Sequence, residues 1–282
     1  MTVAIVTDGA ASLPDDRSRI GNVTVVPLRV MIGTAIKEDA PATLAEILSA
    51  DPGTVRTACP APARYMAAVD QCGSSDGVLI CTVAATLSGS YQAALQASRR
   101  ARVPVRVADT GTAAGGQGLV VLAAARAARA GADLETVAAS AARCGARVRL
   151  VGTVDNIDRL KASGRVPRLA GWAADRLGVQ PVFELRTGRI RELRPARSQH
   201  AAETRMLERL TASGRTGCAL HVAVLHVRAA ERAQRIFKTV TDAHAPVMGY
   251  ITEFDAAMAA HLGPGVVGLA WWREQHQSQP FR

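Results

Sequence analysis

Hydrophobic positions in the first half of the chain alternate between short β-branched runs and longer Ala-rich or mixed stretches. A short apolar run bounded by turn residues is typical of a buried strand, and a longer stretch with helical spacing indicates a helix. Strands are therefore predicted at 3–7, 23–30, 78–82 and 103–108. Helices are predicted at 44–50, from the loop at 60–62 to 71, from the loop at 86–90 to 100, at 116–130 and at 134–143. This alternation predicts a largely parallel sheet with helices on both faces.

After residue 145 the pattern no longer alternates regularly. Strands are predicted at 147–154, 179–185, 189–193, 219–225, 247–251 and 266–271, with helices at 155–162, 201–210 and 229–240. Arg186-Thr187-Gly188 suits a three-residue hairpin loop. We predict an α/β fold of two domains, a three-layer parallel-sheet domain over 1–150 and an α+β domain over 151–282, with an approximate boundary and room for exchanged segments. A length of 282 residues agrees with about two domains.

Polar residues follow several of the strands predicted in the first half. Asp8, the loop that precedes Ser88, and Asp109 all fall at carboxyl ends of predicted strands. Ligands of open α/β sheets bind beyond these ends. The same edge of the sheet is therefore the expected place for a site.

Composition narrows the class of protein. A hydrophobic content of 48% allows a large core and excludes disorder driven by charge. The net charge is +10, but the arginines are spread along the chain, so no specific nucleic-acid partner is expected. The start lacks a basic leader segment, and Arg126 interrupts the apolar stretch at 119–125, so we predict a cytoplasmic protein without a transmembrane segment. Transient contact with a membrane surface stays open.

Common cofactor and metal motifs do not fit this sequence. No Gly-rich loop precedes any of the three lysines, and no HExxH or GxSxG occurs. Residues 263–268 match GxGxxG, but a helix precedes them and a strand follows, the reverse of a dinucleotide site. The five cysteines lack CxxC spacing. We expect no metal site and no cofactor.

Five segments in order resemble the DegV family, whose members include fatty-acid-binding proteins of the FakB type. The segments are Ile5-Val6-Thr7-Asp8-Gly9 with Leu13-Pro14 and Val25-Val26-Pro27-Leu28, then Thr57-Ala58-Cys59-Pro60-Ala61-Pro62, Leu87-Ser88-Gly89-Ser90-Tyr91-Gln92, Gly164-Arg165-Val166, and His261-Leu262-Gly263-Pro264-Gly265. The chain departs from the family pattern at Gly9, where members usually carry Ser, and at Ala58 and Ala61, where two hydroxyls are missing.

The resemblance implies a lipid-binding protein rather than an enzyme. A long-chain fatty acid would lie in a buried apolar tunnel, with its carboxylate near the domain junction. The protein would present that carboxylate to a separate ATP-dependent fatty acid kinase, which makes the acyl phosphate used in phospholipid metabolism. The residues implied for the carboxylate are Thr57, Ser88, Gly89 and His261. The supporting residues implied are Asp8, Arg165 and Arg197.

Physical chemistry leaves alternatives open at the same residues. The Ser88 hydroxyl at a predicted helix start suits an anion, but it equally suits a simple N-cap. A serine-dependent acyl-transfer enzyme would use Ser88 as nucleophile, His261 as base and Asp8 to orient the base. Arg165 and Arg197 suit a phosphoryl group or the kinase, although arginine is also an ordinary surface residue.

Overall fold

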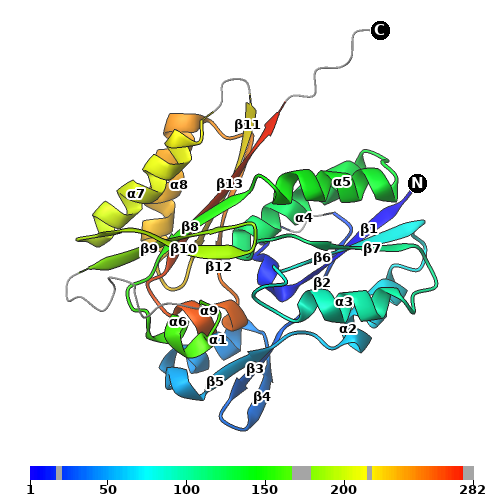
Figure 1. The fold of residues 1–282 in the computed structure, drawn as a ribbon, viewed down its shortest axis with the longest axis horizontal. Coiled ribbons are helices and arrows are strands. Elements are labelled where there is room, and N and C mark those ends of the chain that lie inside the picture. Colours follow the sequence, from blue (N-terminus) through cyan, green and yellow to red (C-terminus); the bar gives the residue numbers. More distant parts are fainter. Residues whose placement is uncertain (17–20, 167–178, 215–217, 276–282) are drawn as a thin grey trace.

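A computed structural model describes residues 1–16, 21–166, 179–214 and 218–275. The described strands form three sheets (Figure 1). The first is a four-stranded parallel sheet in the order β2-β1-β6-β7. Its strands are β1 (Val3–Asp8), β2 (Val23–Val26), β6 (Gly77–Thr82) and β7 (Val105–Asp109). The two central strands are buried throughout, as expected for a parallel sheet covered on both faces.

Helices cover both faces of the parallel sheet. Alternate residues of β1 point to opposite faces, so Ala4 and Val6 pack with one pair of helices while Val3 and Ile5 pack with the other. On the Ala4 side lie α2 (Pro62–Gln71) and α3 (Ser90–Ser98). On the Ile5 side lie α4 (Ala114–Arg129) and α5 (Leu134–Gly145). The short helix η1 (Gly9–Ala11) follows β1 directly.

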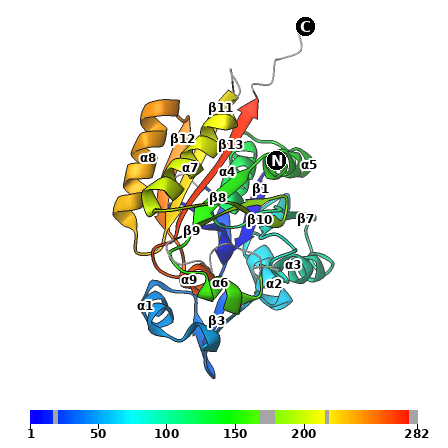
Figure 2. The same cartoon turned by 60° about the vertical axis from the view of Figure 1, so that its left-hand side comes forward.

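The second sheet has six strands in the order β10-β9-β8-β13-β11-β12. The strands are β8 (Arg149–Thr153), β9 (Gln180–Arg186), β10 (Arg189–Ala196), β11 (Cys218–His226), β12 (Met248–Glu253) and β13 (Val267–Gln275). One face packs against α7 (Gln199–Ala212) and α8 (Ala230–His244) through a separate apolar cluster. The opposite face contacts α4, which therefore lies between the two large sheets (Figure 2).

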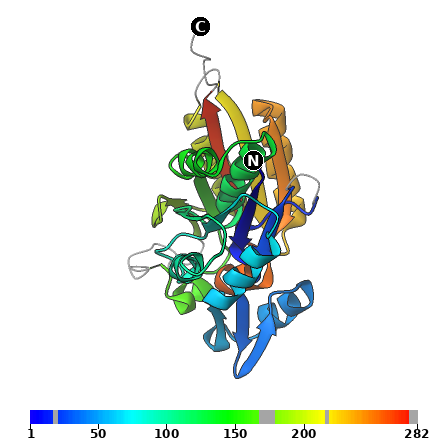
Figure 3. The same cartoon turned by 90° about the vertical axis from the view of Figure 1, so that its right-hand side faces the viewer.

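A small antiparallel sheet protrudes at one end of the molecule (Figure 3). It contains β3 (Arg29–Ile32), β4 (Ala35–Glu38) and β5 (Val55–Ala58), with α1 (Pro41–Ser49) and η3 (Pro52–Thr54) beside it. Two helices from the second half of the chain, α6 (Asp158–Ser163) and α9 (Ala256–Leu262), pack onto this unit. Segments from both halves of the sequence are thus brought together here.

The predicted fold class is confirmed, with three local corrections. The strand predicted at 23–30 is interrupted at Pro27, and its two parts join different sheets. The turn between β9 and β10 has two residues, Thr187 and Gly188, both with positive φ, which is the pattern of a type I′ hairpin. The helix predicted from residue 44 begins at Pro41.

The two large sheets are formed by separate parts of the sequence. The unit around the small sheet, by contrast, contains segments from both parts. The α5 helix ends at Gly145 and β8 begins at Arg149. The domain boundary near residue 150 stays a prediction. In the part of the chain that the structure describes, no helix combines the length and apolarity needed to cross a bilayer.

Candidate functional site

An apolar cavity lies between the six-stranded sheet, the start of α4 and the unit formed by the small sheet with α6 and α9. It is partly open to solvent, and its empty space measures about 1050 Å³ when the open part is counted. Its sheet wall is apolar and is made by Leu150, Gly152, Phe183, Leu185, Ile190 and Gly268. Its polar lining side chains lie on other elements, and they are Thr57, Ser88, Ser163, Arg165 and His261, with Cys59 beside them. The cavity therefore has one polar end and one apolar wall.

The polar end is held together by a hydrogen bond between residues from opposite halves of the chain. Thr57 Oγ1, at the end of β5, lies 2.8 Å from His261 Nε2 on α9. Arg165, just after α6, donates through Nη2 to Thr57 Oγ1 at 3.5 Å. Its guanidinium also donates to the Ser163 carbonyl at 2.6 Å, which fixes its position near the cavity. Three of the predicted site residues thus meet at one place.

His261 is neutral at ordinary pH. Burial and the positive charge of Arg165 lower the pKa of His261 to about 4. A neutral imidazole has one donor and one acceptor nitrogen, so His261 can bond Thr57 through one nitrogen and a ligand through the other. Among the described lining residues Arg165 is the one with a full positive charge, and there is no carboxylate. This end of the cavity therefore favours an anion.

Ser88 lines the cavity, whereas Gly89 lies just outside it. The hydroxyl of Ser88 accepts a hydrogen bond from the Ser90 backbone N–H at 3.2 Å and lies 3.0 Å from the Ser90 hydroxyl. The N-cap of α3 is Gly89, so Ser88 precedes the cap position. Gly89 is exposed, and a Cβ on it would lie 3.2 Å from Cys59 Sγ. Gly89 therefore allows the two loops to approach closely but does not reach the cavity.

Asp8 does not line the cavity but bonds backbone groups next to it. It is fully buried at the end of β1 and accepts hydrogen bonds from the Ala10 and Val83 backbone N–H groups at 3.2 and 3.0 Å. Gln117 Nε2 and the Tyr65 hydroxyl also donate to it, at 2.9 and 3.3 Å. Burial raises the pKa of Asp8. These contacts tie β1 to the segment that leads from β6 to Ser88.

The arrangement needed for serine-dependent acyl transfer is not assembled in the described residues. A nucleophile, base and orienting carboxylate must form a hydrogen-bonded series. Here the side chain of His261 bonds Thr57, and the side chain of Ser88 bonds Ser90. Asp8 bonds to Gln117, Tyr65 and two backbone groups instead. The geometry thus favours binding over covalent chemistry.

Arg197 is not part of the cavity. It lies exposed between β10 and α7, away from the polar end. In the described part of the chain, no group of three or more His, Cys, Asp or Glu side chains is arranged to hold a metal ion. The described cysteines are free thiols.

Three residues that sequence analysis did not single out bind backbone groups at the start of α9, at the end of α1 and in the turn that follows α9. Asp39 accepts from the Ala257 backbone N–H at 3.0 Å at the start of α9, and burial raises its pKa to about 6. Arg159 is buried and donates to the carbonyls of Ile47, Leu48 and Ala50 at 2.9–3.1 Å, beside Gly263.

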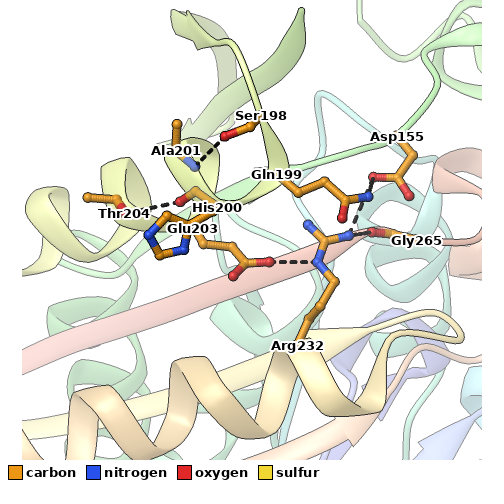
Figure 4. A network of polar contacts seen from close by, with 9 residues as sticks. All are labelled: Asp155, Ser198, Gln199, His200, Ala201, Glu203, Thr204, Arg232 and Gly265. Carbon is orange, nitrogen blue, oxygen red and sulfur yellow. Dashed lines mark hydrogen bonds and ion pairs between the residues drawn. The ribbon is translucent and has the colours of Figure 1, made fainter. Parts of the chain in front are cut away.

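The third residue, Arg232 on α8, clamps the turn between His261 and β13 (Figure 4). Its guanidinium donates to the Gly265 carbonyl at 2.7 Å, to Glu203 at 2.6 Å and to Asp155 at 3.4 Å. Gln199 donates to Asp155 at 3.1 Å. Gly265 has φ of +80°, and a Cβ on it would overlap Asp155, so glycine is required at this point.

These features define a class of protein, a two-part α/β fold that encloses an apolar cavity with one anion-favouring end. The chain belongs to the DegV family: the family model, described as "Uncharacterised protein, DegV family", matches residues 2–274. A DegV domain-containing protein of Streptomyces coelicolor is 33% identical over 275 residues, covering 95% of this chain and 97% of that protein. One from Mycobacterium tuberculosis is 30% identical, covering 95% and 96%.

Solved structures agree with this assignment. A DegV family protein from Thermus thermophilus, described by its fatty acid binding, superposes with a TM-score of 0.88 at 26% identity, covering 97% of this chain and all of that one. DegV from Bacillus subtilis, described as a fatty acid binding protein, has a TM-score of 0.84 at 23% identity, covering 97% and 100%. The family resemblance drawn from the sequence motifs is confirmed.

Proposed function

We propose that this protein binds a long-chain fatty acid in the cavity and presents its carboxylate to a separate ATP-dependent fatty acid kinase. The observation that carries the proposal is the distribution of polarity in the cavity. Thr57, Arg165 and His261 gather at one place, Ser88 lines the same cavity, and the sheet wall contributes apolar side chains and glycine. The fatty-acid-binding protein of Thermus thermophilus, which shares the fold over its whole length, gives independent support.

The energetics of the cavity suit such a ligand. Burial contributes about 0.8 kcal/mol per CH₂ group, so a 16-carbon tail gains on the order of 10 kcal/mol before ordering costs. A buried carboxylate is costly unless it receives hydrogen bonds. The Arg165 guanidinium donates at this end of the cavity, and the bonded pair of Thr57 and neutral His261 has one further hydrogen to donate, from either the hydroxyl or the ring.

The exposure of the two ends suits transfer of the ligand's reactive group. Thr57, Ser88, Arg165 and His261 are all partly exposed, whereas Leu150, Gly152, Phe183 and Leu185 in the sheet wall are buried. A kinase could therefore reach the carboxylate while the tail stays covered. One carboxylate oxygen would attack the γ-phosphorus of ATP on the kinase, giving acyl phosphate and ADP. This chain would need no cofactor and would work in the cytoplasm, where ATP is available.

The first test is mass spectrometry of the purified protein under native and denaturing conditions. A stoichiometric fatty acid released on denaturation, or tight binding of hexadecanoic acid by delipidated protein, is the expected result. Protein that is free of lipid and also refuses hexadecanoic acid would overturn the binding proposal. The kinase step is tested separately, by adding loaded protein and ATP to candidate kinases and measuring acyl phosphate as a hydroxamate.

A further inference from the structure

One row of residues across the sheet wall of the cavity contains two adjacent glycines, which contribute no side chains to the wall. Residues directly opposite each other in a sheet point to the same face. Across β9, β8, β13 and β11 the register aligns Phe183 with Gly152, Gly152 with Gly268, and Gly268 with Leu225. The two glycines thus form a gap in the wall, between a phenyl ring and a leucine. Gly152, Gly268 and Phe183 all line the cavity.

The neighbouring row on the same face has no such gap. There Ile190, Leu185, Leu150, Ala270 and Ala223 follow one another across the strands. Every one of these residues carries a side chain, and the first three reach the cavity. The gap is therefore local to one row and lies in the wall that faces the apolar part of the cavity.

Gly152 has an explanation within the protein. A Cβ on it would lie 3.0 Å from the ring carbon Cζ of Phe183 and 3.3 Å from the Val267 carbonyl oxygen. Such distances require the ring to move, so glycine at this position allows Phe183 to pack over β8. The backbone of Gly152 itself is not in the left-handed region.

Gly268 has no such explanation. A Cβ on it would lie 3.4 Å or more from every neighbouring atom, with Leu225 and Leu150 as the nearest side chains. Its φ is not positive, and the pairing of β13 with β8 and β11 continues through it without a bulge. Glycine inside a strand weakens the strand and often marks a bulge, a bend, or a place where a ligand or another backbone approaches closely. Gly268 lines the cavity, which favours the approach of a ligand.

We propose that Gly268 is a specificity-determining position of the fatty acid site. The inference rests on the proposed function and names the part of the ligand that needs this glycine, which is the distal acyl chain. The polar lining side chains lie on other elements, so the proposal places the apolar end of a chain anchored at Thr57 and His261 against the sheet wall. The bare backbone of β13 lets that end lie against the sheet, and the missing side chain sets how long a chain the cavity accepts.

The test compares Gly268→Ala and Gly268→Val with wild type by titrating delipidated protein with saturated acids of 10, 12, 14, 16 and 18 carbons. The valine variant should bind hexadecanoic acid about tenfold more weakly, as when roughly two methylene groups leave the cavity. Its affinity for decanoic acid should stay within about twofold of wild type, because in this proposal only the end of a long chain lies against β13. The alanine variant should show a smaller shift in the same direction.

The alanine variant should lose affinity for long chains without losing thermal stability. Alanine fits the space at 268 without strain. Replacing glycine by alanine at such a position reduces the conformational entropy of the unfolded chain, which stabilises the folded state. The melting temperature of ligand-free Gly268→Ala should therefore equal or exceed that of wild type. Gly53→Ala, a matched change on η3 outside the cavity, should leave the chain-length profile unchanged.

Two results would overturn the inference. One is an unchanged chain-length profile in the valine variant, and the other is an equal loss of affinity for all chain lengths. In either case wild type still binds hexadecanoic acid, so the proposed function stands. Failure of wild type to bind any of the acids would overturn the proposed function instead.

Discussion

The polar end of the cavity and its sheet wall are built in different ways. The polar end uses side chains from β5, α9 and the loops after β6 and α6, and its central hydrogen bond joins residues 204 positions apart. The sheet wall uses a continuous ladder whose backbone groups bond one another, and only apolar side chains or bare backbone face the cavity. Recognition at the polar end therefore depends on single functional groups, and recognition at the wall depends on volume.

The largest effect is expected where the polar end depends on a buried group behind it. Asp8→Ala leaves two backbone N–H groups, the Gln117 amide and the Tyr65 hydroxyl without their acceptor. Each unsatisfied buried donor is costly, so the free energy of unfolding in urea should fall by about 3 kcal/mol or more. Asp70→Ala, an exposed carboxylate on α2, is the control and should change it by less than about 0.5 kcal/mol. Similar small losses in both variants would show that Asp8 supports nothing.

The polar end and the sheet wall can be compared by removing one hydroxyl group from the first and one methylene group from the second. Thr57→Val removes the hydroxyl bonded to His261 with little change in shape, and affinity for hexadecanoic acid should fall about tenfold or more. Leu150→Val removes one methylene from the sheet wall and should cost about fourfold, corresponding to about 0.8 kcal/mol. Isothermal titration calorimetry on delipidated protein measures both.

Thr239→Val, on the exposed surface of α8, serves as the control for the threonine change and should bind as wild type does. The comparison fails if the Leu150 variant loses more affinity than the Thr57 variant. That ranking would mean that volume, rather than hydrogen bonding, dominates at both ends.

An effect confined to low pH follows from the lowered pKa of His261. The folded protein holds this group neutral down to about pH 4, whereas in the unfolded chain it takes up a proton near its ordinary value of 6.5. The unfolded state therefore binds more protons between these pH values, and stability falls as the pH drops from 6.5 to 4. His261→Gln lacks this titration, so ligand-free wild type should lose stability relative to the variant across that window. Parallel stability curves for the two proteins would contradict the assignment.

The smallest effect is expected at Arg197. Arg165 lies at the polar end and Arg197 is exposed outside the cavity. Substitution of these two arginines should therefore change the binding affinity by different amounts. Arg165→Ala should weaken hexadecanoic acid binding several-fold by removing the cation near the carboxylate. Arg197→Ala should stay within about twofold of wild type. Fluorescence displacement titrations suffice, and equal losses would place Arg197 in the site.

The sequence predicted the parallel sheet well because β1 and β6 are unbroken apolar runs with turns at their ends. It did not predict β4 and β5, since every residue in them except Val55 is at least partly exposed and the polarity does not alternate clearly. The joining of 23–30 into one strand came from hydrophobicity alone, although Pro27 cannot donate to a ladder.

The same contrast holds for the candidate site. Thr57, Ser88, Arg165 and His261 could be named in advance because they stand in local motifs, and the structure places them on one cavity. Asp39 and Arg159 could not, because their partners are a helix terminus 218 positions away and carbonyl groups 109–112 positions away. Tertiary packing decides which backbone groups at helix ends need a side-chain partner. A short stretch of sequence does not indicate this.

The position of β13 in its sheet has a consequence for the order of assembly during synthesis. β13 emerges from the ribosome after β8 and β11, yet it lies between them. Until it is inserted, the β10-β9-β8 and β11-β12 segments share no ladder, and the bare patch at Gly268 does not exist. The turn that follows His261 is completed in the same step. A nascent chain therefore has no finished cavity until β13 has emerged and paired with both neighbours, so a ligand can be enclosed only after that step.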